Sequence, residues 1–102
     1  MAKEAAAAIV ICGDPSLEKY PVFWVQDCSA ATQNILLAAH ALGLGAVWSG
    51  IYPLEDRSSG FRKLLGIPEN IVPLSMVIIG YPLEMPKPVT RFKGERIRYN
   101  KW

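Results

Sequence analysis

The sequence predicts an α/β fold, in which strands alternate with helices along one chain of 102 residues. Two continuous apolar runs, 6–12 and 74–79, are typical of buried strands. Between them lies an alanine-rich segment, 27–42, whose apolar residues recur at helical spacing. The expected order is strand, helix, strand, helix, strand and an extended tail, which favours a sheet covered by helices.

Turn residues bound each of the three expected strands. The first, "AAAIVIC" at 6–12, is predicted to be a strand and not a secretory signal, because Glu4 lies where such signals carry only positive charge. The second, "AVWSG" at 46–50, follows two glycines, and the third, "LSMVII" at 74–79, ends in Gly-Tyr-Pro. We expect an irregular connection over 14–26.

Two helices are expected, each with start or stop signals. Asp27 suits the N-cap of the long helix, and Gly43 suits the left-handed position after its end, with Leu44 as hydrophobic follower. A second, weaker helix over about 54–65 ends at Gly66. Apolar residues surround most of the long helix, which therefore calls for more cover than three short strands and one weaker helix provide.

The glycines Gly43, Gly45 and Gly50 raise the question of a dinucleotide-binding loop. In that fingerprint the glycines follow a strand and open a helix. Here they follow a helix and open a strand, and no further glycine has the required spacing. The sequence therefore excludes this kind of phosphate loop.

Composition is that of an ordinary globular domain, with 51% hydrophobic and 20% charged residues. No apolar run approaches the roughly 18 residues that a membrane span needs. Cys12 and Cys28 lack CxxC spacing, and we expect small buried residues in a reducing, cytoplasmic compartment. His40 has no sequence partner for a metal, so we expect no metal site.

Charge divides the single domain, 1–102, into an α/β body, 1–86, and a basic extended tail, 87–102. The whole chain carries a net charge of +2, whereas the tail alone carries +5. Such a tail is usually a solvated face or an anion contact. We expect no nucleic-acid partner, because the body carries net negative charge.

No combination of acid, base and nucleophile stands out in the sequence. The serines share one histidine and lack the nucleophile-elbow pattern, and neither a P-loop lysine nor zinc-ligand spacing is present. A protein of this kind is still an enzyme if a bound cofactor carries the chemistry. We therefore assign no catalytic residue to the chain itself.

Three stretches together resemble the C-terminal half of nitroreductase-family flavoproteins. They are "DCSAATQNILLAAHALGLGAVWSGIYP" at 27–53, "LLGIPENIVPLSMVIIGYP" at 64–82 and "TRFKGERIRYNKW" at 90–102. The resemblance implies the C-terminal portion of an α+β sandwich that works as an intertwined homodimer or higher oligomer. It also implies an FMN-dependent oxidoreductase that moves hydride from NAD(P)H to nitroaromatics, quinones or similar acceptors.

The same resemblance assigns five residues to the cofactor. In the family, residues just after this strand approach the flavin ring, which maps to Ser49 and Gly50, with Trp48 adjacent. Gly50 lets backbone come close to a flat ring. The family also places basic side chains near the C-terminus on the FMN phosphate, which maps to Arg91 and Lys93.

Members of the resembled family are longer and begin with a segment that grips the FMN phosphate and ribityl chain. This sequence lacks that segment, so two readings stay open. In the first, the chain belongs to an FMN-dependent oxidoreductase whose flavin site a partner chain completes, or which is incomplete as a fragment. In the alternative, it is a non-enzymatic truncated remnant, a self-associating α/β module that binds flavin weakly or not at all.

Overall fold

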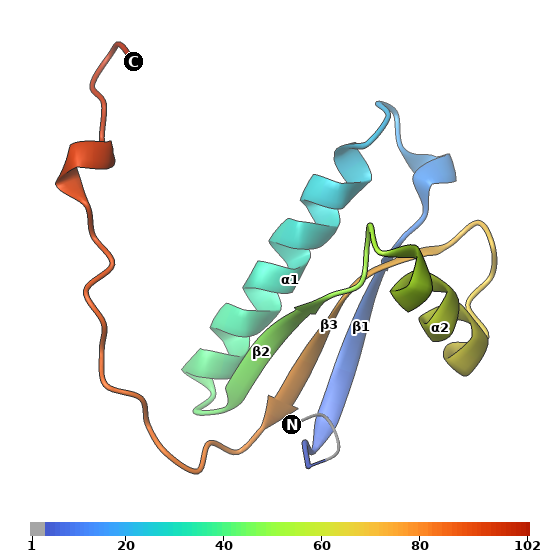
Figure 1. Ribbon diagram of the computed structural model, residues 1–102, viewed down its shortest axis with the longest axis horizontal. Helices are drawn as coiled ribbons and strands as arrows, with labels where there is room; N and C mark the ends of the chain where they lie inside the picture. The colour runs from blue at the N-terminus through green and yellow to red at the C-terminus, as the bar shows by residue number, and fades with distance from the viewer. Residues whose placement is uncertain (1–3) are drawn as a thin grey trace.

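The computed structural model describes residues 4–102, which form three strands, two α-helices and two short 3₁₀ turns (Figure 1). The order β-α-β-α-β confirms the alternation expected from the sequence. The elements are β1 (Ala7–Gly13), α1 (Phe23–Ala41), β2 (Gly45–Gly50), α2 (Glu55–Leu65) and β3 (Val72–Gly80). Beyond β3 the chain continues through 81–86 into the tail, 87–102, which runs away from the sheet.

The last strand in sequence, β3, is the centre of the sheet, whose order is β1-β3-β2. Both neighbours run antiparallel to it. Because β3 is paired on both sides, its middle residues are buried, and Ser75 and Val77 have no exposed surface. By contrast, β2 is an edge strand, paired with β3 from Gly45 opposite Gly80 to Gly50 opposite Ser75.

A buried pair of hydroxyl groups joins α1 to the centre of β3. The Oγ1 of Thr32 lies 2.8 Å from the Oγ of Ser75, and both residues are fully buried. The Thr32 hydroxyl also donates to the carbonyl oxygen of Cys28 at 2.7 Å, so the Ser75 hydroxyl is the donor between the pair. Since Ser75 points toward α1, Val77 shares that face, and Ile78 lies on the opposite face.

The start of α1 differs from the sequence-based expectation. The helix begins at Phe23, not after Asp27, so the expected irregular connection is shorter than 14–26. The carboxylate of Glu18 accepts hydrogen bonds from the backbone N–H groups of Val22, at 2.8 Å, and Trp24, at 2.9 Å. It thereby satisfies N–H groups that a helix start leaves free. The N-cap rule considers only the residue directly before the helix, and it therefore missed a cap that Glu18 supplies from the preceding turn.

The C-terminal end of α1 confirms the expected glycine cap. Gly43 has a φ of +74°, in the left-handed region. The N–H of Gly43 donates to the His40 carbonyl at 3.0 Å, and the N–H of Leu44 donates to the Ala39 carbonyl at 2.9 Å. This is the paired pattern of a Schellman motif. At the end of α2, Gly66 is left-handed as well, with a φ of +64°.

The strand boundaries agree with the expectation to within two residues, with β3 extended at both ends. The expectation for the cysteines is wrong for Cys12, which is exposed, while Cys28 is half-buried. The reason is that β1 is an edge strand, and apart from Gly13 its residues are exposed or half-buried in this chain.

The long helix α1 is covered along one side only. Within the described residues, its buried side chains are Trp24, Thr32 and Ala39. Apolar side chains elsewhere on this helix and at its end remain in solvent, with Leu37 59% and Leu42 75% exposed. The structure thus agrees with the expectation that this chain provides too little cover for the helix.

Removing one hydroxyl of the buried pair should lower stability by a different amount than removing the other. We expect Thr32→Val to lower the free energy of unfolding by about 1–3 kcal/mol, because the Ser75 hydroxyl then stays buried without a partner. Ser75→Ala should cost only about 1 kcal/mol, since Thr32 keeps its bond to the Cys28 carbonyl. Urea unfolding of both variants measures the difference, and a larger loss for Ser75→Ala would contradict this account.

Candidate functional site

The residue Gly50 ends β2 at the free edge of the sheet. The N–H of Ile51 donates to the carbonyl of its opposite residue, Leu74, at 3.0 Å, so this is a hydrogen-bonded pair of the antiparallel ladder. Hydrogen-bonded and non-hydrogen-bonded pairs alternate along such a ladder. Gly50 and Ser75 are therefore a non-hydrogen-bonded pair, and the N–H and C=O of Gly50 point away from β3.

The space beside Gly50 is open. A Cβ placed on this residue would meet no heavy atom within 4 Å, apart from its own chain neighbours. The backbone there is nevertheless held in place, because the N–H groups of Ile51 and Tyr52 both donate to the Leu74 carbonyl at 3.0 Å. A flat molecule therefore has access to a fixed stretch of backbone with an outward-facing donor.

The three neighbouring site residues from the sequence lie together but do not share one face. Trp48 is opposite Val77, whose side chain lies on the α1 face, and Trp48 is 37% exposed. Ser49 is opposite Met76 and points to the other face of the sheet. A flat ligand on one face thus meets the side chain of Trp48 or that of Ser49, together with the backbone of Gly50.

The two basic residues expected at a phosphate lie elsewhere. Arg91 and Lys93 are exposed residues of the tail, which leaves the sheet after β3 (Figure 1). The structure therefore does not bring them together with Gly50 within one chain. The tail carries one short 3₁₀ turn, Gly94–Arg96, where the Arg98 guanidinium donates to the Glu95 carbonyl.

Sequence reasoning missed two groups that define the surroundings of Gly50. The side chain of Arg57, in the first turn of α2, donates to the Gly50 carbonyl at 2.7 Å. The rings of Trp24 and Tyr52 meet edge to face, with centroids 5.0 Å apart. The sequence carries no signal for the contact between the two rings, which lie far apart along the chain, nor for an exposed arginine in a polar helix.

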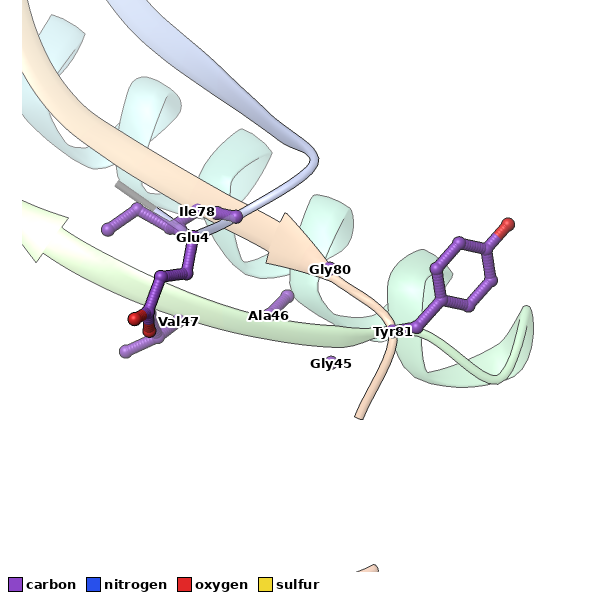
Figure 2. Close-up of a pocket in the computed structure, with 8 residues that line it drawn as sticks. Glu4, Gly45, Ala46, Val47, Ile78, Gly80 and Tyr81 are labelled. Atoms are coloured by element: carbon purple, nitrogen blue, oxygen red, sulfur yellow. The ribbon is translucent and has the colours of Figure 1, made fainter. Parts of the chain in front are cut away.

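Two hollows lie near the other end of β2. The first, of about 320 Å³, lies on the sheet face opposite α1, where Figure 2 shows Glu4, Val47 and Ile78 in front of the strands. The second, of about 270 Å³, lies between the C-terminal end of α1 and the proline-containing segment, lined in part by His40 and Met85. Both involve Gly45 and Ala46, so neither is the open space at Gly50.

The described residues offer little chemistry of their own. Partial desolvation raises the pKa of the Cys12 thiol, although the residue is largely exposed and Arg62 acts in the opposite direction. Burial also raises the pKa of Cys28, and the nearby Asp27 and Cys12 add to the rise. Raised pKa values leave little thiolate near neutral pH, so both thiols are poor nucleophiles. Residues 4–102 contain no cluster of three or more His, Cys, Asp or Glu suited to a metal.

Among residues 4–102, neither α-helix has the length and apolar character needed to cross a bilayer.

Comparison with known proteins gives one family. A family model described as the nitroreductase family matches residues 1–81. A protein of Methanothermobacter thermautotrophicus, provisionally named NADH dehydrogenase/NAD(P)H nitroreductase, is 59% identical over 102 residues. The alignment covers 100% of this chain and 53% of that relative, so the chain spans about half of the relative's length.

Solved structures show the same fold. A provisionally named NADH oxidase of Clostridium acetobutylicum superposes with a TM-score of 0.92 and 39% identity, over 98% of this chain and 61% of that one. A nitroreductase of Desulfitobacterium hafniense, solved with bound FMN, gives a TM-score of 0.71 and 28% identity, over 98% of this chain and 53% of that one. The element order described above is therefore part of a larger fold in these proteins.

The open space at Gly50 predicts that a side chain is tolerated there. We expect Gly50→Val to melt within a few degrees of the wild type, because no heavy atom obstructs the new Cβ and β-branched residues favour strands. In contrast, Gly13→Ala should melt clearly lower, since its Cβ would lie 2.5 Å from Cε3 of Trp24. Thermal unfolding followed by circular dichroism tests both, and unfolding of Gly50→Val would show that packing requires the glycine.

Proposed function

Because this chain belongs to the nitroreductase family, we propose that it forms part of an FMN-dependent oxidoreductase that takes hydride from NAD(P)H. The acceptors we propose are nitroaromatics, quinones or similar small molecules. The observation that carries the proposal is the outward-facing backbone of Gly50 at the free edge of β2. The family match covers residues 1–81, which include this strand.

The donor set at the end of β2 fits the edge of a flavin ring. The edge of a flavin ring carries hydrogen-bond donors and acceptors, and backbone groups must come close to bind them. Gly50 offers a backbone N–H with no side chain in the way. Next to it, Trp48 supplies an aromatic surface on one face and Ser49 a hydroxyl on the other. The N–H groups of Ile51 and Tyr52, both bound to Leu74, keep this edge in one conformation.

The proposed contacts divide between two parts of the cofactor. Backbone at Gly50, with Trp48 or Ser49, would hold the ring, whereas Arg91 and Lys93 would hold the phosphate through charge-assisted hydrogen bonds. When bound, FMN supplies hydride and electron transfer, chemistry that no described side chain provides. The role of the protein chain is then to bind the flavin ring, to orient it and to set its electrostatic surroundings.

The separation of the two contact sets favours an assembly of chains. Since the tail runs away from the sheet, a tail from a second copy can bring its Arg91 and Lys93 to the Gly50 of the first. We therefore propose a homodimer or higher oligomer, in which the body, 1–86, and the tail, 87–102, act on different subunits. We also propose a reducing, cytoplasmic compartment, in which Cys12 and Cys28 stay free thiols.

A second candidate function rests on the exposed apolar surface of α1. Leu37 and Leu42 are exposed, and the tail exposes further large apolar side chains, among them Phe92 and Trp102. Such surface favours association whether or not flavin is bound. In this alternative the chain is a self-associating module that binds flavin weakly or not at all. The visible absorbance of the purified protein separates the two, because bound flavin makes the preparation yellow.

The ring contact predicts a loss of flavin binding without a loss of fold. In Gly50→Val the branched side chain would stand where the backbone should meet the ring, so FMN and riboflavin should both bind at least about tenfold more weakly, equivalent to about 1.4 kcal/mol. Quenching of flavin fluorescence measures both affinities. Gly60→Val, in the open face of α2, is the matched control and should change neither. Unchanged FMN affinity in Gly50→Val would remove Gly50 from the site.

The phosphate contact predicts a different pattern. Arg91→Ala should weaken FMN binding by about 1.5–3 kcal/mol, the worth of a hydrogen bond to a charged group. Riboflavin, which lacks the phosphate, should be affected much less. Titration of both ligands against wild type and variant gives the comparison, and equal losses for the two ligands would place Arg91 away from the phosphate.

A further inference from the structure

A single hydrogen bond connects α2 to the end of β2. The Nη1 of Arg57 donates to the carbonyl oxygen of Gly50 at 2.7 Å. As shown above, this carbonyl faces the free edge of the sheet, so β3 does not bond it. The guanidinium is therefore a second contact that orients the peptide after Gly50, in addition to the bond from the Ile51 N–H to the Leu74 carbonyl.

Both ends of this bond are held by buried structure. On the strand side, Ile51 is 1% exposed and its N–H is bonded to the Leu74 carbonyl. On the helix side, the N–H of Arg57 donates to the Leu54 carbonyl at 3.1 Å, and the next residue, Ser58, is buried. The bond thus joins two anchored backbone segments, while the Arg57 side chain and Gly50 are themselves exposed.

The bond also places a cation at the strand end. Its acceptor is a neutral carbonyl, so the bond does not cancel the charge of Arg57. Arginine guanidinium groups carry a positive charge in proteins. A fixed positive charge favours negative charge that develops on a neighbouring group, and reduction adds negative charge to a flavin.

We propose that Arg57 is a positioning residue for the ring contact at Gly50, an inference that rests on the function proposed above. Its guanidinium holds the Gly50 carbonyl and so steadies the strand end that presents the Gly50 N–H, and its charge makes the bound flavin easier to reduce. The sequence offers a matched control, because Arg62 donates in the same way to the Pro68 carbonyl, at 2.6 Å, near the other end of α2.

The positioning role is tested first without flavin. In Arg57→Met, hydrogen exchange of the hydrogen-bonded amides of Ile51, Tyr52 and Leu54 should become about tenfold faster, the factor expected for loss of one charged hydrogen bond. Arg62→Met should leave these amides unchanged and speed exchange near 66–71 instead. Unchanged exchange of these three amides in Arg57→Met would overturn the positioning role, whether or not the protein binds flavin.

The effect on the cofactor is tested next. Arg57→Met should weaken FMN and riboflavin by the same factor, because the residue acts on the ring end, and this separates it from Arg91. It should also lower the reduction midpoint potential of the bound FMN, whereas Arg57→Lys, which keeps the charge, should restore most of that potential but not the slow exchange. Arg62→Met should change neither affinity nor potential.

The outcomes distinguish this proposal from the function on which it rests. If the wild type binds no FMN, the proposed function fails, and the flavin part of this proposal fails with it. If the wild type binds FMN but Arg57→Met keeps its affinity and potential, the proposal for Arg57 alone is overturned. A loss of FMN with riboflavin unaffected would place Arg57 at the phosphate, which also contradicts it.

Discussion

The pairing of β2 with β3 is the interaction on which the candidate site depends. Because β3 is the central strand, its backbone is bonded on both sides, and its register against β2 decides which groups of β2 face outward. A slip of one residue would turn the N–H of Gly50 toward β3 and exchange the faces of Trp48 and Ser49. The buried bond between Thr32 and Ser75 holds α1 on the same strand, so helix and register are fixed together.

The sequence was sufficient for most of the fold because its signals are local. Apolar runs gave the three strands, and the left-handed position of Gly43 gave the end of α1. The start of α1 was wrong because its cap, the carboxylate of Glu18, lies outside the adjacent position that sequence rules examine. The exposure of Cys12 was missed because an apolar run does not show whether its strand lies at the centre or at the edge of the sheet.

The candidate site was less predictable, because it depends on geometry between elements. The resemblance to a family pointed to Trp48, Ser49 and Gly50. Only the pairing of β2 with β3 shows that the side chains of Trp48 and Ser49 lie on opposite faces of the sheet. Arg57 could not be found from the sequence, since its bond to Gly50 requires the tight turn between β2 and α2. Arg91 and Lys93 were placed by resemblance alone, and the structure puts them in a tail away from the sheet.

The central claim is that the backbone at Gly50 contacts a flavin, and residue-resolved titration tests it most directly. In the ¹⁵N-labelled protein, the amide resonance of Gly50 and those of its neighbours in 48–52 should shift on addition of FMN and reach saturation. Riboflavin should shift the same resonances, because the proposed contact is to the ring. Saturable shifts confined to other parts of the chain, with the Gly50 resonance unmoved, would contradict the account.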